Sequence, residues 1–162
     1  MRLYFLILLV LFSLDQLSKF WIISAMNLYE THPIIPGFFN LVYVTNKGAA
    51  FSMFASVDSP WRHYFFVGVN SIALIALTIA AFKMINQHIF YRVSFALIGA
   101  GALGNLFDRL RFGAVIDFLD FYIGSYHWPA FNVADSSICV GVALLFILNI
   151  IEIKKEKNRK NP

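Results

Sequence analysis

Four long apolar segments decide what this sequence can fold into. They cover residues 3–23, 64–82, 89–107 and 131–151. A helix needs about 20 apolar residues to cross a bilayer core about 30 Å thick. Each segment has about that length, so we expect a membrane all-α fold with four transmembrane helices. No linker or repeat divides the chain, and we treat residues 1–162 as a single integral membrane domain.

The composition excludes a small water-soluble protein. Hydrophobic residues make up 59% of the chain and charged residues 14%, whereas soluble domains average about 45–50% and about 25%. The net charge is +4, but five of the thirteen Lys and Arg residues lie in residues 154–162. Cations beside an apolar segment are typical of a membrane-flanking tail, so we expect membrane lipid and no nucleic acid among the partners.

The positions of Lys and Arg predict the orientation. If both termini are cytoplasmic, eight of the thirteen cations fall on the inner side, including those of the basic cytoplasmic tail 154–162. Cytoplasmic connections are enriched in Lys and Arg, so we expect this orientation, with residues 24–61 and 108–130 facing outward. The first segment carries Asp15 and Lys19 where a cleavable signal would have small residues, and we expect it to be retained.

The first outward segment contains a pattern typical of a β-strand. Residues 38–45 are mainly β-branched and aromatic, and the turn-prone sequence Asn46-Lys47-Gly48 follows them. We expect a short sheet resting on the membrane surface.

Polar residues of three apolar segments fall at one depth. At a rise of 1.5 Å per residue, they gather near the outer ends of the helices and in the outward segment between them; they are Asp15, Lys19, Asn105, Asp108, Arg109, Asp117, Asn132 and Asp135. Ionisable side chains inside a membrane are costly and usually functional. We therefore expect these residues to form one site.

Structural roles remain open for the same residues. Asp15 and Lys19 are four residues apart and could neutralise each other. Asn132 could cap a helix that has Asp135 in its first turn. The charges at 108–111 could be a cluster at the membrane interface, and the glycines at 99, 101 and 104 could allow close helix packing.

The residue types available limit the chemistry of such a site. The four histidines are scattered without a metal-ligand spacing, and no nucleophilic serine motif is present. Cys139, the only cysteine, lies in an apolar segment, where we expect a small core residue. Paired aspartates remain: they cannot both ionise, so one holds a proton while the other can take one from water. This chemistry needs no metal and no cofactor.

Five short motifs are similar to those of one known family. They are Asp15-Gln16-Leu17-Ser18-Lys19, Asn46-Lys47-Gly48-Ala49-Ala50-Phe51, Gly101-Ala102-Leu103-Gly104-Asn105-Leu106-Phe107-Asp108-Arg109, Val115-Ile116-Asp117-Phe118 and Phe131-Asn132-Val133-Ala134-Asp135-Ser136. Each alone is short and unspecific. Their order on a four-span chain of this length resembles the bacterial lipoprotein signal peptidases, the signal peptidase II family, from end to end.

The resemblance implies an intramembrane aspartic endopeptidase of the bacterial inner membrane. Such an enzyme removes the signal peptide from prolipoproteins at the outer face of that membrane, directly before a cysteine that carries diacylglycerol. The resemblance also implies a small curved β-sheet and a short outer helix within residues 38–54. We expect these prolipoproteins and membrane lipid as partners, and a monomeric protein.

The matching motifs also imply a role for each polar residue. Asp117 and Asp135 would be the catalytic pair. Around them, Asn46 and Gly48 would border the substrate; Asn105, Asp108 and Arg109 would line the site and order the pair; Asn132 and Ala134 would shape its floor; Asp15 and Lys19 would support the fold. Asp120 belongs to no motif, but it could share a helical face with Asp117.

Two functions of other classes remain as alternatives. A small proton-coupled transporter would also place carboxylates in membrane helices, but near the midplane and accessible from both sides. A membrane scaffold without activity would leave the polar residues without a chemical role. The acidic residues cluster on one side of the predicted membrane region, which favours the peptidase.

Overall fold

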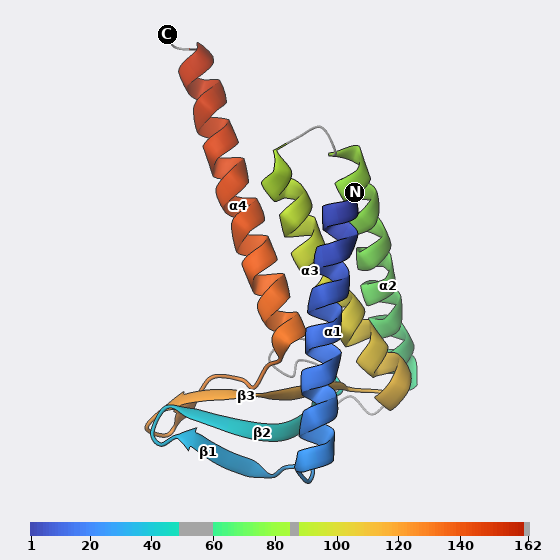
Figure 1. Ribbon diagram of the computed structural model, residues 1–162, viewed down its shortest axis with the longest axis vertical. Coiled ribbons are helices and arrows are strands. Elements are labelled where there is room, and N and C mark those ends of the chain that lie inside the picture. The colour runs from blue at the N-terminus through green and yellow to red at the C-terminus, as the bar shows by residue number, and fades with distance from the viewer. Residues whose placement is uncertain (49–59, 85–87, 161–162) are drawn as a thin grey trace.

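The helical part of the structure agrees with the prediction. The computed structural model describes residues 1–48, 60–84 and 88–160. The helices of this part of the chain are α1 (Arg2–Ala25), α2 (Pro60–Lys83), α3 (Ile89–Phe112) and α4 (Val133–Lys160) (Figure 1). All four are long and apolar enough to cross a membrane.

The C-terminal end of α3 lies further along the chain than predicted. The helix continues to Phe112 instead of ending at residue 107, so Asp108 and Arg109 are helical and do not belong to an outward loop. It ends at Gly113, whose φ of 73° lies in the left-handed region that favours glycine, and whose N–H bonds to the Arg109 carbonyl.

Two other helices also differ at their ends. α2 begins at Pro60 rather than at residue 64, and proline is well suited to the first turn of a helix. α4 begins at Val133 rather than at residue 131, and it continues through most of the basic tail to Lys160 instead of ending at 151. Hydropathy marks the part of a helix that can lie in a membrane, but it does not register polar turns at the helix ends.

α3 is the central helix. It packs against α1, α2 and α4, and 61% of the residues in its apolar window are buried, against 11–17% in the other three helices. In Figure 1, α1 crosses in front of α3, and α2 and α4 lie on either side. Because neighbouring helices surround α3, it can carry polar side chains that would be costly against lipid.

Glycines allow the close packing of α3. A Cβ atom on Gly101 would lie 2.2 Å from the Ala134 carbonyl oxygen of α4. One on Gly104 would lie 2.5 Å from the Asp15 carboxylate of α1. The packing role that the sequence left open for these two glycines is therefore confirmed.

A four-stranded antiparallel sheet accompanies the helices. Its strands are β1 (Thr31–Ile35), β2 (Phe39–Asn46), β3 (Val115–Ile123) and β4 (Tyr126–His127), paired in that order. The predicted strand corresponds to β2, but its neighbours have no counterpart in the prediction. Asp117 therefore lies in a strand and not in an outward loop.

The pairing of β2 with β3 is irregular near Asp117. The register shifts between Leu41 and Val44, and Val44 then pairs with Asp117. Irregularities of this kind bend a strand and redirect its side chains. The short outer helix that the resemblance implies after β2, up to residue 54, lies outside the described residues.

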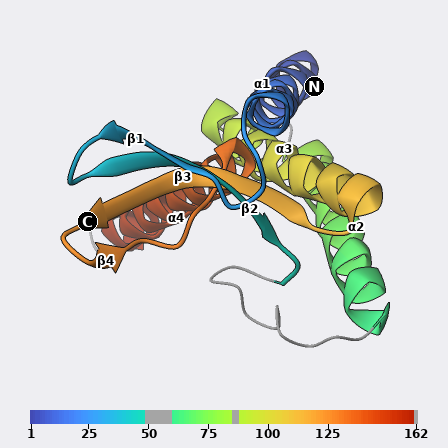
Figure 2. The ribbon, with the colours of Figure 1, turned by 90° about the horizontal axis from the view of Figure 1, so that it is seen from below.

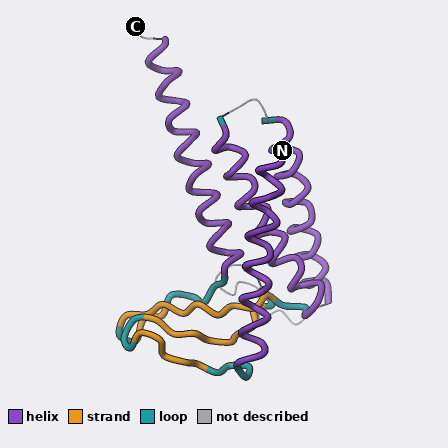
Figure 3. Tube along the Cα trace, in the orientation of Figure 1, coloured by secondary structure: helices purple, strands orange, loops and turns teal. Residues whose placement is uncertain are grey.

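The sheet lies at the end of the helices opposite both termini. Figure 3 shows the strands gathered at that end and running across the helix axes. Figures 1 and 2 both show the sheet projecting sideways on the α4 side. Ile22 of α1 and Met26, directly after this helix, pack with Phe118 of β3 in a buried cluster, which ties the sheet to the first helix.

Gly101→Ala tests the close approach of α3 and α4. The added Cβ would overlap the Ala134 carbonyl oxygen, 2.2 Å away, so the helices must separate. Overpacking of this kind typically costs about 1–3 kcal/mol, and we expect a lower midpoint of thermal unfolding in detergent. In the control Gly68→Ala, nothing lies within 4 Å of the new Cβ, and the midpoint should stay or rise. Equal effects of the two changes would contradict the packing role.

Candidate functional site

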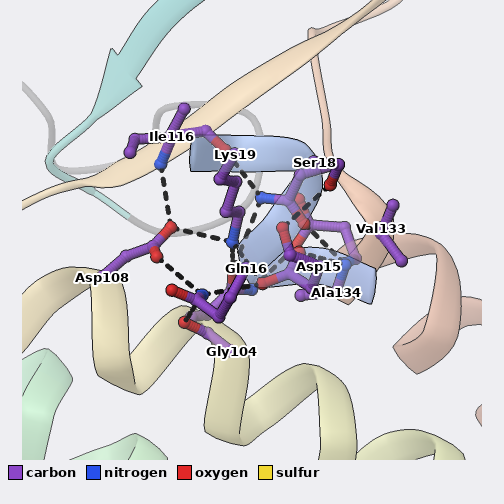
Figure 4. A network of polar contacts seen from close by, with 12 residues as sticks. Asp15, Gln16, Ser18, Lys19, Gly104, Asp108, Ile116, Val133 and Ala134 are labelled. Carbon is purple, nitrogen blue, oxygen red and sulfur yellow. Dashed lines mark hydrogen bonds and ion pairs between the residues drawn. The ribbon is translucent and has the colours of Figure 1, made fainter. Parts of the chain in front are cut away.

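A buried lysine ties α1 to α3 at the sheet end of the helices. The Lys19 ammonium lies 2.8 Å from the carboxylates of both Asp15 and Asp108 (Figure 4). It also donates to the side-chain oxygen of Asn105 at 3.4 Å. An ammonium group has three N–H donors, so these acceptors satisfy all of them. Asp15 and Lys19 therefore do not form a self-contained pair but belong to a larger network.

Gln16 completes this network from α1. Its amide nitrogen donates to Asp15 and to Asp108, at 3.0 Å each, and Figure 4 shows it between the two carboxylates. The other oxygen of Asp15 accepts a hydrogen bond from the Ala134 N–H at 2.9 Å. Helices α1 and α3 and the start of α4 thus meet at one ion network.

Asp108 also fixes the start of β3. Its carboxylate accepts a hydrogen bond from the Ile116 N–H at 3.2 Å. Ile116 directly precedes Asp117, which is buried. The ion network therefore helps to determine where the Asp117 side chain lies.

Two asparagines connect the carboxylates of Asp117 and Asp135. The Asn132 amide nitrogen donates to Asp117 at 2.8 Å, and that of Asn105 donates to Asp135 at 2.8 Å. Asn132 also donates to the side-chain oxygen of Asn105 at 3.4 Å. This chain of hydrogen bonds joins the two aspartates, and it reaches Lys19 through the same Asn105 oxygen.

The start of α4 positions Asp135. Asn132 precedes the helix, and its side-chain oxygen accepts a hydrogen bond from the Asp135 N–H at 2.9 Å. This is the geometry of a helix cap, so the capping role is confirmed, and it coexists with the bond to Asp117. Asp135 lies in the first turn of α4, where the helix dipole favours a negative charge.

Arg109 holds the chain after β2 against the site. Its guanidinium donates to the carbonyl oxygens of Gly48 at 2.9 Å and Asn105 at 3.4 Å. It also lies 5.3 Å from the ring centre of Phe66 in α2. The Asn46 side-chain oxygen accepts from the Gly48 N–H at 2.9 Å. The buried guanidinium is close enough to interact electrostatically with both aspartates of the pair.

The surroundings of Asp117 favour its protonated form. Burial, followed by the negative charge of Asp135, raises the pKa of Asp117 from its usual 3.8 to about 7. Hydrogen bonds from Asn132 and Asn46 and the charge of Lys19 act in the opposite direction without cancelling this effect. The Asp117 carboxyl can therefore hold or release a proton near neutral pH, as acid–base catalysis requires.

Asp120 lies outside this network. Side chains of a strand alternate between its two faces, so Asp120, three residues after Asp117 in β3, points to the opposite face. Its carboxylate accepts a hydrogen bond from Asn40 of β2 at 2.8 Å and bonds with His127 of β4 at 2.9 Å. The shared helical face considered for Asp117 and Asp120 is wrong, because the segment is a strand.

The polar residues selected from the sequence lie together in these networks. They are Asp15, Lys19, Asn46, Gly48, Asn105, Asp108, Arg109, Asp117, Asn132, Ala134 and Asp135. Sequence reasoning assigned no role to Gln16 or Phe66. Gln16 lies inside a matched motif, and this could have marked it as a site residue. Phe66 is one of eighteen phenylalanines, and no sequence feature distinguishes it from the others.

The cysteine does not occupy the place expected for it. Cys139 is exposed on α4 and is not a core residue, because the apolar surface of a membrane helix faces lipid. Among the residues that the structure describes, no group of three or more His, Cys, Asp and Glu side chains could hold a metal ion.

Comparison with known sequences points to one family. The family described as Signal peptidase (SPase) II matches residues 7–151. The lipoprotein signal peptidase of Geobacter metallireducens is 43% identical over 160 residues, which are 99% of this chain and 97% of the relative. That of Geobacter sulfurreducens is 48% identical over 92% of this chain and 89% of the relative. That of Yersinia pestis is 44% identical over 94% of this chain and 88% of the relative.

The fold is similar to that of solved membrane enzymes. A bacterial membrane enzyme determined by the in meso method at 2.3 Å is 34% identical, with a TM-score of 0.83 over 96% of this chain and 92% of that chain. A second bacterial membrane enzyme, determined by the same method at 1.9 Å, is 35% identical, with a TM-score of 0.79 over 91% of this chain and 92% of that chain.

Asp117 makes the stability of the fold depend on pH. Its pKa is about 7 in the folded state, against the usual 3.8 that we assume for the unfolded chain. Between these values the folded state binds the additional proton, so stability decreases as pH rises from about 4 to about 7. Asp117→Asn lacks this contribution. The difference in unfolding midpoint, variant minus unchanged protein, should therefore be larger at pH 8 than at pH 4.5. Ser125→Ala, in an exposed turn, is the control; a difference that is constant with pH would contradict the raised pKa.

Proposed function

Because the chain belongs to the signal peptidase II family of aspartic peptidases, we propose that Asp117 and Asp135 are its catalytic pair. The observation that carries this proposal is the chain of hydrogen bonds between the two carboxylates through Asn132 and Asn105. The raised pKa of Asp117 supports it, since a catalytic carboxylate pair must hold one proton between its members.

In the proposed reaction, Asp117 begins protonated and Asp135 begins as a carboxylate. Asp135 takes a proton from a water molecule whose oxygen attacks the scissile carbonyl carbon, and Asp117 gives its proton to the carbonyl oxygen. The gem-diol then breaks down: Asp135 gives its proton to the leaving nitrogen, and Asp117 takes a proton back from a hydroxyl. One water molecule is consumed, and both aspartates return to their starting states.

The neighbouring residues would position this pair. Asn105 and Asn132 each orient one carboxylate, and Arg109 supplies a positive charge that can stabilise the oxygens of the gem-diol. Asn46 and Gly48, at the end of β2, would border the substrate, since the bond from Arg109 to Gly48 keeps this segment at the site.

We propose that the substrates are prolipoproteins whose cysteine carries diacylglycerol. Relatives at 43% and 48% identity are lipoprotein signal peptidases, and the place of the site suits such a substrate. The pair lies where α3 and α4 meet the sheet, at one end of the membrane-spanning helices. A signal helix and its lipid can diffuse through the bilayer to this level, while water can still reach the scissile bond.

The projecting end of the sheet supports a location at the membrane surface. It exposes the apolar residues Ile34, Ile35 and Phe38 near the β1–β2 turn, and Ile123 and Tyr126 near the β3–β4 turn. Exposed apolar and aromatic side chains are typical of the region where a membrane meets water. We therefore place the sheet against the outer surface of the membrane.

We propose that the protein is a monomer and lies in the bacterial inner membrane. Both of its termini would then be in the cytoplasm. The start of α1 and the end of α4 lie opposite the sheet (Figure 1), and residues 154–160 of the basic tail belong to that end of α4. The positive-inside rule assigns that end to the cytoplasm. A dimer in native mass spectrometry would contradict the monomer.

The transporter alternative is not supported. The family and the relatives that match the chain are signal peptidases, and the paired carboxylates lie at the sheet end of the helices and not at their middle.

Asp→Asn changes at the pair test the catalytic assignment. Asparagine keeps the size of aspartate but cannot exchange the proton. Asp117→Asn and Asp135→Asn should therefore each reduce cleavage of a lipidated precursor to background, and the double variant should lose little more. Cleavage is measured by mass spectrometry with equal amounts of folded protein.

Asp120→Asn is the matched control for these variants. Asp120 lies on the same strand as Asp117, but its partners are Asn40 and His127, so substantial activity should remain. Loss of activity at Asp120 with activity retained at Asp117 would show that the wrong carboxylate was assigned. Continued cleavage by folded Asp135→Asn would limit Asp135 to a structural role at the start of α4.

Lipidation of the precursor tests the substrate class. Purified protein is incubated with a diacylglyceryl-modified prolipoprotein and, separately, with the unlipidated form. The lipidated form should be cleaved at least about tenfold faster, because burial of only two CH₂ groups contributes about 1.6 kcal/mol. Equal rates would refute lipid specificity and leave the peptidase activity standing.

Cysteine labelling tests the orientation. In a Cys139→Ala background, a cysteine replacing Ser125, in the turn after β3, should react with an impermeant thiol reagent in intact cells. One replacing Asn158, near the end of α4, should react only after the cells are opened. The reverse pattern would place the sheet and the carboxylate pair on the cytoplasmic side.

A further inference from the structure

A groove between α1 and α3 has no role in the proposed reaction. It is an open hollow of about 410 Å³, and its lining includes Phe12, Gln16, Leu17, Phe20, Phe107 and Arg111. The rings of Phe12 and Phe107 meet edge to face at 5.7 Å between their centres. Leu17 and Phe20 are well exposed, so the groove opens toward the lipid that would surround these helices.

The groove and the carboxylate pair lie on opposite sides of α3. Successive residues of a helix are rotated by about 100°, so two residues that are two positions apart point in nearly opposite directions. Asn105 and Arg109 contact the carboxylate pair and the chain after β2, whereas Phe107 and Arg111 line the groove. The groove is therefore separate from the place where a peptide bond would be cleaved.

The groove is apolar along α1 and has a cation at one end. Arg111 lies in the last turn of α3, about 6 Å beyond Phe107 along the helix axis. Its guanidinium stacks at 4.9 Å from the ring centre of Phe112. Among the described residues, Arg111 forms no ion pair. A groove that is apolar along α1 and ends at a cation matches the order of an acyl chain and a phosphate in a phospholipid.

We propose that this groove binds one anionic phospholipid, with an acyl chain along Phe12, Leu17 and Phe20 and its phosphate on Arg111. A guanidinium can bind phosphate through two parallel hydrogen bonds, and basic pockets between membrane helices bind anionic headgroups. The lipid is anionic because, among the described residues, no carboxylate pairs with Arg111, whereas a zwitterionic lipid brings its own cation to the phosphate.

Gln16 links the groove to the buried ion network. Its side chain lines the groove, and its amide nitrogen donates to both Asp15 and Asp108. A lipid in the groove covers this amide from the membrane side and keeps water away from the network. Because the lipid binds only the folded protein, it stabilises the fold by mass action.

Lipid titration of the full chain tests this site. The protein in detergent is titrated with phosphatidylglycerol, or with phosphatidylcholine that carries the same acyl chains, and followed by thermal unfolding and native mass spectrometry. Phosphatidylglycerol should raise the unfolding midpoint more and should be retained as one copy. In Arg111→Gln, the affinity for phosphatidylglycerol should fall about fivefold, the equivalent of the ~1 kcal/mol that one cation contributes near anionic lipid.

Two further variants separate charge from shape. Arg62→Gln removes the same charge from the first turn of α2, also at the sheet end of the helices, and should keep the lipid preference. Leu17→Trp leaves the charge in place but fills the groove, and should weaken the binding of both lipids.

Three results would overturn the proposal, and none depends on cleavage activity. The first is equal affinity of Arg111→Gln and the unchanged protein for phosphatidylglycerol. The second is equal stabilisation by inorganic phosphate, which would indicate an anion site without an acyl chain. The third is displacement of the bound lipid by a lipidated precursor, which would assign the groove to the substrate.

Discussion

A positive charge buried between α1 and α3 is the constraint on which the rest of the site depends. Lys19 is only 1% exposed, and removing an ammonium group from water costs several kcal/mol unless opposite charges and hydrogen bonds replace the water. Its acceptors come from both helices: Asp15 from α1, and Asp108 and Asn105 from α3. The two helices must therefore keep one register, because a slide of one turn, about 5.4 Å, would separate the charges.

The same network places the two aspartates of the proposed reaction. Asp108 holds the start of β3 through the Ile116 N–H, and Asp15 holds the start of α4 through the Ala134 N–H. Asp117 and Asp135 thus come from different elements that are attached to one ion network. Burial within this assembly, together with the charge of Asp135, raises the pKa of Asp117. The packing that stabilises the fold therefore also prepares the acid–base chemistry.

The two sides of α3 face different environments. Asn105 and Arg109 face the carboxylate pair, while Phe107 and Arg111 line the groove on the other side. Gly104 lets α1 approach closely, and a Cβ there would meet the Asp15 carboxylate at 2.5 Å. Because α1, α2 and α4 pack around most of α3, its buried polar side chains can find partners inside the protein.

The sequence by itself determined the four helices, the strand β2 and the set of polar residues at one end, because apolar length, strand pattern and the cost of buried charge are local properties. It did not reveal β3, which is a strand because it pairs with β2, a segment far away in the sequence. The matched motif singled out Asp117, but the sequence left open whether Asp120 shares its face. Only the tertiary structure decided that Asp117 bonds with Asn132 whereas Asp120 bonds with Asn40 of β2, since contacts between distant segments select those partners.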